Sequence, residues 1–166
     1  FMHLRSLQNK GFISRTSKAR SITLFGKRKR ARHTSFVLAI PLIGRISAGQ
    51  PLNSEESREG EVYCDSSMFK NEDTSRLFAL KINGDSMKDK GILDGDCVIV
   101  RQVSTVRPGD IVVALAGDET TVKSYYPAGG KIELRPANPK FKIQKYRPSD
   151  IKIQGKVIGL QRSLTS

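Results

Sequence analysis

The sequence predicts a mainly β fold for residues 37–166, preceded by the remnant of a second, smaller domain. Two observations support this prediction: short apolar runs rich in β-forming residues recur, and dipeptides typical of turns separate them. The runs are residues 36–40, 77–82, 97–100, 111–115, 120–126, 131–134 and 151–160. The turn signals are Asn83-Gly84, Asp94-Gly95, Pro108-Gly109, Gly117-Asp118 and Gly129-Gly130. No segment of helical periodicity interrupts them, so we expect a compact, mostly antiparallel domain of short strands.

Residues 1–24 have a different pattern. Leu4 and Leu7 lie three positions apart and Gly11 follows, as at the end of an amphipathic helix. Residues 12–13 and 22–24 are typical of two short strands, and the basic, serine-rich residues 14–21 would form the hairpin between them. Because the chain opens inside a helix-like pattern, we expect that an upstream part of this domain is missing.

Charge is concentrated near the start of the chain. The net charge is +13, yet residues 1–36 carry ten Lys or Arg and no acid, and the remaining residues have a net charge of +3. The densest run, Lys27 to Arg32, predicts a solvated linker over residues 25–36. A flexible tether is the favoured interpretation of this run, and an arm that contacts nucleic-acid phosphates is the alternative.

Several classes of protein are excluded by composition. No run of about 18 apolar residues is present, so no transmembrane helix and no membrane partner are expected. Cys64, Cys97, His3 and His33 have no metal-ligand spacing, and we expect no metal and no cofactor. Two lone thiols fit a reducing, cytoplasmic environment.

The possible chemistry is narrowed by what residues 37–166 lack. They contain no histidine, which excludes Ser-His-Asp and Cys-His sites and leaves Ser or Thr with a lysine base. Ser86 follows Gly84-Asp85 at the end of a predicted strand, and Lys123 is flanked by β-branched and aromatic residues. Burial of such a lysine would lower its pKa. On these patterns alone, a turn serine and a solvent-facing lysine are the more common interpretations.

Five motifs, taken in order, resemble those of the LexA-type self-cleaving serine proteases. They are residues 41–52 with Ala48-Gly49, residues 84–87 followed by 91–96, residues 121–123, residues 131–138 and residues 155–160. The resemblance covers about residues 38–164 and implies the antiparallel β domain that this family shares with signal peptidases. It also implies that Ser86 is the nucleophile, that Lys123 is the general base, and that Ala48–Gly49 is the scissile bond. The backbone N–H groups of Asp85 and Ser86 would be the oxyanion donors.

Residues 1–24 resemble the end of a LexA-type winged helix-turn-helix domain, comprising the last part of its third helix and its wing. Arg15, Lys18 and Arg20 are candidate contacts to DNA phosphates. The first two helices are absent from this sequence, so we expect operator DNA to be bound by the full-length protein only.

The resemblance implies a repressor of the DNA-damage (SOS) response that inactivates itself when RecA–single-stranded DNA filaments favour a docked cleavage loop. It also implies a homodimer formed through the β domain. Residues 151–160 are a candidate contact strand, and a purely core strand is an equally good interpretation of them. An alternative function is a UmuD-like polymerase accessory subunit, which shares an Asp before the serine. A basic nucleic-acid-binding β protein without catalysis is another, and the absent membrane anchor argues against a signal peptidase.

Overall fold

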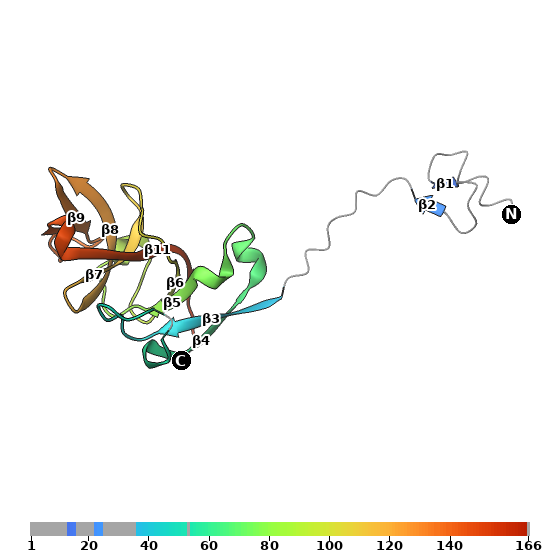
Figure 1. Cartoon of the computed structure of the whole chain (residues 1–166), viewed down its shortest axis with the longest axis horizontal. Helices are drawn as coiled ribbons and strands as arrows, with labels where there is room; N and C mark the ends of the chain where they lie inside the picture. The colour runs from blue at the N-terminus through green and yellow to red at the C-terminus, as the bar shows by residue number, and fades with distance from the viewer. Residues whose placement is uncertain (1–12, 16–21, 25–35, 53, 166) are drawn as a thin grey trace. The chain divides into compact units, whose positions relative to one another are not determined.

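The computed structural model describes residues 13–15, 22–24, 36–52 and 54–165 of the chain, which forms two compact units, residues 1–35 and 36–166 (Figure 1). In the first unit, β1 (Ile13–Arg15) pairs antiparallel with β2 (Ile22–Leu24), and Ile13 lies opposite Leu24. Two short strands are therefore present where the sequence predicts them. The predicted helix end and most of the linker lie outside the described residues.

The second unit is built on one open sheet of nine strands, which confirms the mainly β prediction. The strands are β3 (Val37–Ile43), β4 (Arg58–Asp65), β5 (Leu77–Lys81), β6 (Cys97–Arg101), β7 (Ile111–Ala116), β8 (Glu119–Ala128), β9 (Lys131–Arg135), β10 (Gln144–Tyr146) and β11 (Ile151–Gln161). Their order across the sheet is β10-β9-β8-β7-β11-β6-β5-β3-β4. All neighbours are antiparallel except β3 and β5, which are parallel over a short stretch.

Short 3-10 helices occupy several of the connections. They are η1 (Glu55–Ser57), η2 (Ser66–Phe69), η3 (Thr74–Arg76), η4 (Lys88–Lys90) and η5 (Pro148–Asp150). Within the part of the chain that the structure describes, no helix combines the length and apolar character needed to cross a membrane.

Two strands, β4 and β10, escape prediction from the sequence. Both lie at the edges of the sheet, where one side of the strand has no neighbour. β4 alternates charged residues with a glycine and a few apolar residues, and β10 has only three residues, none of them aliphatic. Edge strands are commonly short and charged because these features discourage pairing with other chains, and the same features hide them from a search for apolar runs.

The long strand β11 joins the two halves of the sheet. Its first part pairs with β7 and its second part pairs with β6, and the register shifts once along each pairing. Both edges of the strand are thus used inside the domain (Figure 1). Residues 151–160 therefore form a core strand, which is one of the two interpretations that the sequence left open. Their role in a dimer stays a prediction.

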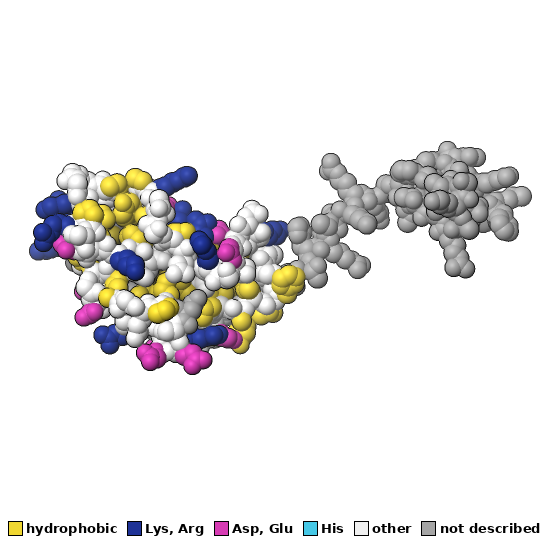
Figure 2. Space-filling view, viewed as in Figure 1, with side chains coloured by type: hydrophobic (Ala, Val, Ile, Leu, Met, Phe, Trp, Pro, Cys, Tyr) yellow, Lys and Arg dark blue, Asp and Glu magenta, His cyan; other side chains and the backbone are white. Residues whose placement is uncertain are grey.

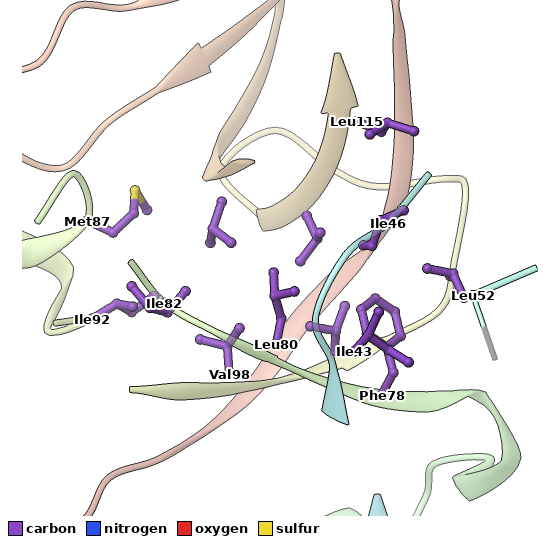
Figure 3. Close-up of a cluster of buried hydrophobic side chains, with 13 residues drawn as sticks. Ile43, Ile46, Leu52, Phe78, Leu80, Ile82, Met87, Ile92, Val98 and Leu115 are labelled. Atoms are coloured by element: carbon purple, nitrogen blue, oxygen red, sulfur yellow. The ribbon is translucent and has the colours of Figure 1, made fainter. Parts of the chain in front are cut away.

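Three apolar clusters stabilise the sheet. The largest covers one face of β5 and β6, continues onto β7 and β8, and includes Met87 and Ile92 from the loop after β5 (Figure 3). The opposite face packs into two smaller clusters, one around Ile99 and one around Leu134. β5 is buried on both faces, which explains its uninterrupted apolar sequence.

Gly155 makes the junction of β11 possible and gives a stability prediction. A Cβ at this position would lie 2.5 Å from the backbone oxygen of Arg101 and 2.6 Å from Val100 Cγ1. We expect Gly155→Ala to lower the free energy of unfolding by about 2 kcal/mol or more, because overpacking a core forces the backbone to shift. Denaturant unfolding followed by circular dichroism measures this change.

Gly60→Ala is the matched control, because nothing lies within 4 Å of the Cβ position at Gly60 in edge strand β4. It should change the free energy of unfolding by about 0.5 kcal/mol or less. Equal effects of the two substitutions would contradict the close approach at Gly155.

Candidate active site

The loop between β5 and β6 holds Ser86 in a closed turn structure. The Ile82 N–H donates to the Asp96 carbonyl at 2.8 Å, and the Gly95 N–H donates to the Ile82 carbonyl at 2.9 Å, which closes the base of the loop. Gly84 adopts a φ of 93°, a conformation that favours glycine, and its N–H donates to Asp94 Oδ1 at 2.7 Å. Met87, next to Ser86, is buried in the largest apolar cluster and anchors the loop from below.

A second segment, Ala137 and Asn138 shortly after β9, contacts the same loop. The Ala137 N–H donates to the Ser86 carbonyl at 2.7 Å, and the Asp89 N–H donates to the Ala137 carbonyl at 2.7 Å. The Asn138 side-chain amide donates to the Asp85 carbonyl at 3.0 Å. The main chain of Ser86 is therefore fixed from two directions. The sequence motif over residues 131–138 marked this segment without indicating what it does.

Lys123 lies on β8 with its side chain directed at Ser86. Its Nζ is 2.9 Å from Ser86 Oγ, and only 9% of the residue is exposed. Burial lowers the pKa of the Lys123 amine, and the negative charge of Glu119 partly opposes this shift. The structure therefore brings together the serine and the lysine that the sequence singled out, 37 positions apart in the chain.

Two further acceptors surround the amine. Lys123 Nζ donates to Thr121 Oγ1 at 2.8 Å and to the Val122 carbonyl at 3.1 Å. A neutral amine has two N–H groups and one lone pair. If Thr121 and Val122 accept the two N–H groups, the lone pair faces the Ser86 hydroxyl and can take its proton. The sequence motif over residues 121–123 includes Thr121 but gave it no role, although its position two residues before Lys123 on a strand puts both side chains on one face.

The hydroxyl and the amine open onto a cleft of about 610 Å3. Its walls include the loop around Ser86 on one side, the start of β8 on another, and Phe141 with Lys142 on a third. The N–H groups of Asp85 and Ser86 donate to no acceptor within the described residues. Both residues line the cleft, so these two donors are available to a group bound there.

Ala48 and Gly49 lie away from this cleft, in an exposed turn closed by the Gln50 N–H and the Ser47 carbonyl at 3.4 Å. Neither residue is among those that line the cleft. On either side of the turn, Ile46 and Leu52 are buried in the largest apolar cluster. Figure 3 shows these two side chains at one end of that cluster and Met87 at the other. The structure therefore has the turn undocked.

The sequence also predicted DNA-contacting residues in the first unit. Arg15 ends β1, and Lys18 and Arg20 lie outside the described residues. Cys64 and Cys97 are free cysteines. In the described ranges, no group of three or more His, Cys, Asp or Glu is placed to hold a metal ion.

Comparison with known proteins agrees with this geometry. The family model described as "Peptidase S24-like" matches residues 41–158. The LexA repressor of Myxococcus xanthus is 37% identical over 171 residues, which cover 98% of this chain and 77% of the relative. The LexA repressor of Polaromonas sp. is 38% identical over 175 residues, covering 97% and 74% of the two chains. The chain therefore belongs to the Peptidase S24-like family and is a LexA-type repressor with the self-cleaving serine peptidase domain of that family.

Proposed function

We propose that this chain inactivates itself by cleaving its own Ala48–Gly49 bond, with Ser86 as the nucleophile and Lys123 as the general base. The single observation that carries the proposal is the 2.9 Å contact between the Ser86 hydroxyl and a buried amine whose pKa is lowered. A lysine serves as a base only when it is uncharged, and desolvation favours the uncharged form.

The reaction follows from the atoms in the cleft. Lys123 Nζ takes the Ser86 proton while Oγ attacks the carbonyl carbon of Ala48 in the docked loop. The resulting oxyanion accepts hydrogen bonds from the Asp85 and Ser86 N–H groups. The bond to the Gly49 nitrogen then breaks, and the Lys123 ammonium returns its proton to the leaving amine. Water, deprotonated by Lys123, hydrolyses the Ala48 ester and leaves a carboxylate at Ala48.

Control of this reaction lies in the position of the loop. With Ile46 and Leu52 buried at the other end of the cluster, the undocked state is the resting state, and docking must draw the turn into the cleft. Because the substrate is tethered, a small docked population is enough for slow cleavage. We propose that a RecA–single-stranded DNA filament binds the docked state better and so raises its population during DNA damage.

The remaining parts of the proposal concern DNA and assembly. The full-length protein would bind operator DNA as a repressor of SOS genes, and the cut would separate residues 1–48 from the β domain. A homodimer through the β domain and a cytoplasmic location, which the free thiols fit, complete it. The matches to LexA repressors extend over nearly all of this chain, including the part before residue 41, and this supports the repressor over a UmuD-like accessory subunit.

The first prediction tests the two catalytic residues. At alkaline pH the purified chain should break into two fragments whose masses correspond to residues 1–48 and 49–166, in a first-order reaction independent of protein concentration. Ser86→Ala and Lys123→Ala should each abolish cleavage, because one removes the nucleophile and the other the base. Mass spectrometry over time measures the fragments. Cleavage of either variant at the parental site and rate would show that the assignment is wrong.

The second prediction concerns pH. The rate should rise with pH as Lys123 loses its proton, and Glu119→Gln should move this rise to lower pH because the Glu119 charge raises the pKa of Lys123. At neutral pH the gain should be about fivefold or less, since an exposed charge contributes about 1 kcal/mol or less. Asp118→Asn, a neighbouring change of charge that does not act on the Lys123 pKa, is the control. An unchanged pH profile for Glu119→Gln would refute the coupling.

The third prediction concerns the resting loop. Leu52→Ala should speed self-cleavage by about tenfold, because burial of a leucine contributes about 1.5–3 kcal/mol and its loss weakens the undocked state. Rates are compared at one alkaline pH. Leu77→Ala, in a different apolar cluster, controls for general destabilisation. Similar acceleration by both variants would mean that loosening of the whole domain, and not release of the loop, is responsible.

A further inference from the structure

The charge of the β domain is strongly uneven. Residues 131–162 carry nine Lys or Arg and two acids, whereas residues 37–130 have more acids than bases. Figure 2 shows Lys and Arg side chains gathered at the end of the domain that holds β9. Six of these nine cations, at positions 131, 135, 140, 142, 145 and 147, lie on or next to β9 and β10, at the end of the sheet where β10 is the edge strand.

Residues 139–147, which we call the basic edge, combine this charge with exposed apolar groups. Phe141 is 45% exposed and Ile143 is 50% exposed. Lysines occupy positions 140, 142 and 145, so cations alternate with the apolar pair. Lys140 and Lys142 form no ion pair with any described residue, whereas Lys145 pairs with Glu133. Aromatic residues are enriched at protein-binding surfaces, and charged groups around them select a partner by charge complementarity.

The basic edge is held in place and is connected to Ser86. The Phe141 N–H donates to the Asn138 carbonyl at 3.1 Å, and the Lys140 N–H donates to Asn138 Oδ1 at 3.0 Å. The same Asn138 donates its amide to the Asp85 carbonyl. The apolar pair is thus presented by an ordered turn, which reduces the entropy lost on binding.

The position of Phe141 explains how binding there can affect cleavage. Phe141 lines the cleft next to Ser86 and also lines a second cleft of about 420 Å3. The basic edge is therefore one rim of the cleft into which the loop must dock. A partner bound on this rim lies next to the docked loop and can contact both.

The composition of the surface selects the chemistry of the partner. Single-stranded DNA would need faces for base stacking, and of the two exposed apolar residues only Phe141 offers one. Asp85 and Asp89 line the second cleft together with Lys88 and Lys140, so this cleft lacks the uniformly positive lining that would follow a phosphate backbone. A protein surface with an apolar pocket ringed by Asp or Glu would satisfy both the apolar pair and the unpaired lysines.

We propose that the basic edge is the docking surface for an activating protein of this chemistry, with Phe141 and Ile143 as anchors and Lys140 and Lys142 pairing with its carboxylates. This inference rests on the proposed function, because the activity that the partner raises is the self-cleavage described above. The proposed function does not say where an activator binds, and the basic edge is the surface we assign to that binding.

The test compares two conditions for the full chain carrying Lys140→Glu and Ile143→Ser together. Alkaline self-cleavage should match the parent, since neither side chain lines the catalytic cleft. Cleavage at neutral pH with a bacterial RecA filament on poly-dT should fall at least tenfold. The control is Lys152→Glu with Met68→Ser, an exposed lysine and an exposed apolar residue outside the basic edge, which should retain stimulation.

Binding is measured separately, by co-sedimentation of the filament with chains that also carry Ser86→Ala. The basic-edge variant should bind at least tenfold more weakly than the control variant. If the parent does not cleave itself but this difference in binding remains, the proposed function fails and the docking surface stands. Equal stimulation of the two variants, no stimulation of the parent by the filament, or stimulation by poly-dT alone would each overturn the inference.

Discussion

The rest of the site depends on one constraint, the burial of the Lys123 amine. A lysine with 9% exposure is costly unless its N–H groups are satisfied, and the fold supplies three oxygen acceptors within 3.1 Å. Two of these come from β8 itself, from Thr121 and Val122, so the strand that carries the amine also orients it. The third is Ser86, the one partner outside β8: its oxygen accepts from the charged amine, and in the proposed reaction its hydroxyl donates to the lone pair of the uncharged amine.

In the proposed mechanism, a permanently activated serine beside a tethered substrate would destroy the protein, so the same fold must keep the two apart. Ile46 and Leu52 provide the opposing force by anchoring both ends of the Ala48–Gly49 turn in the core. The two requirements are linked. In the proposed reaction, docking of the loop would fill the cleft and remove water from the amine, which favours the uncharged form, so more of the Lys123 amine is available as a base when the substrate arrives.

Sequence reasoning found the parts of this molecule that have a strong local signal. The buried strands β5, β6 and β7 are continuous apolar runs, and Ser86 and Lys123 were indicated by the missing histidines and by ordered motifs. The contacts made across the sheet could not be predicted from the sequence. The Asn138 side-chain amide donates one hydrogen bond to the Asp85 carbonyl, 53 positions away, and nothing in the local sequence of Asn138 indicates that partner. The undocked position of Ala48–Gly49 depends on the packing of Ile46 and Leu52, which a motif does not contain.

These constraints also limit how a partner can act. A ligand that binds the docked and undocked states equally well does not change the ratio of the two states. Moving this ratio from 1:99 to 99:1 takes about 5.5 kcal/mol of differential binding free energy. Ile46 and Leu52 are buried, so a partner cannot contact these two side chains while they remain in the core. The rim at Phe141 is exposed with the turn outside the cleft, and a composite surface of rim and loop would exist only with the loop in the cleft. A partner that binds this composite surface prefers the docked state because of its contacts with the loop, and its contacts with the rim fix its orientation. It can therefore favour cleavage without unfolding the core.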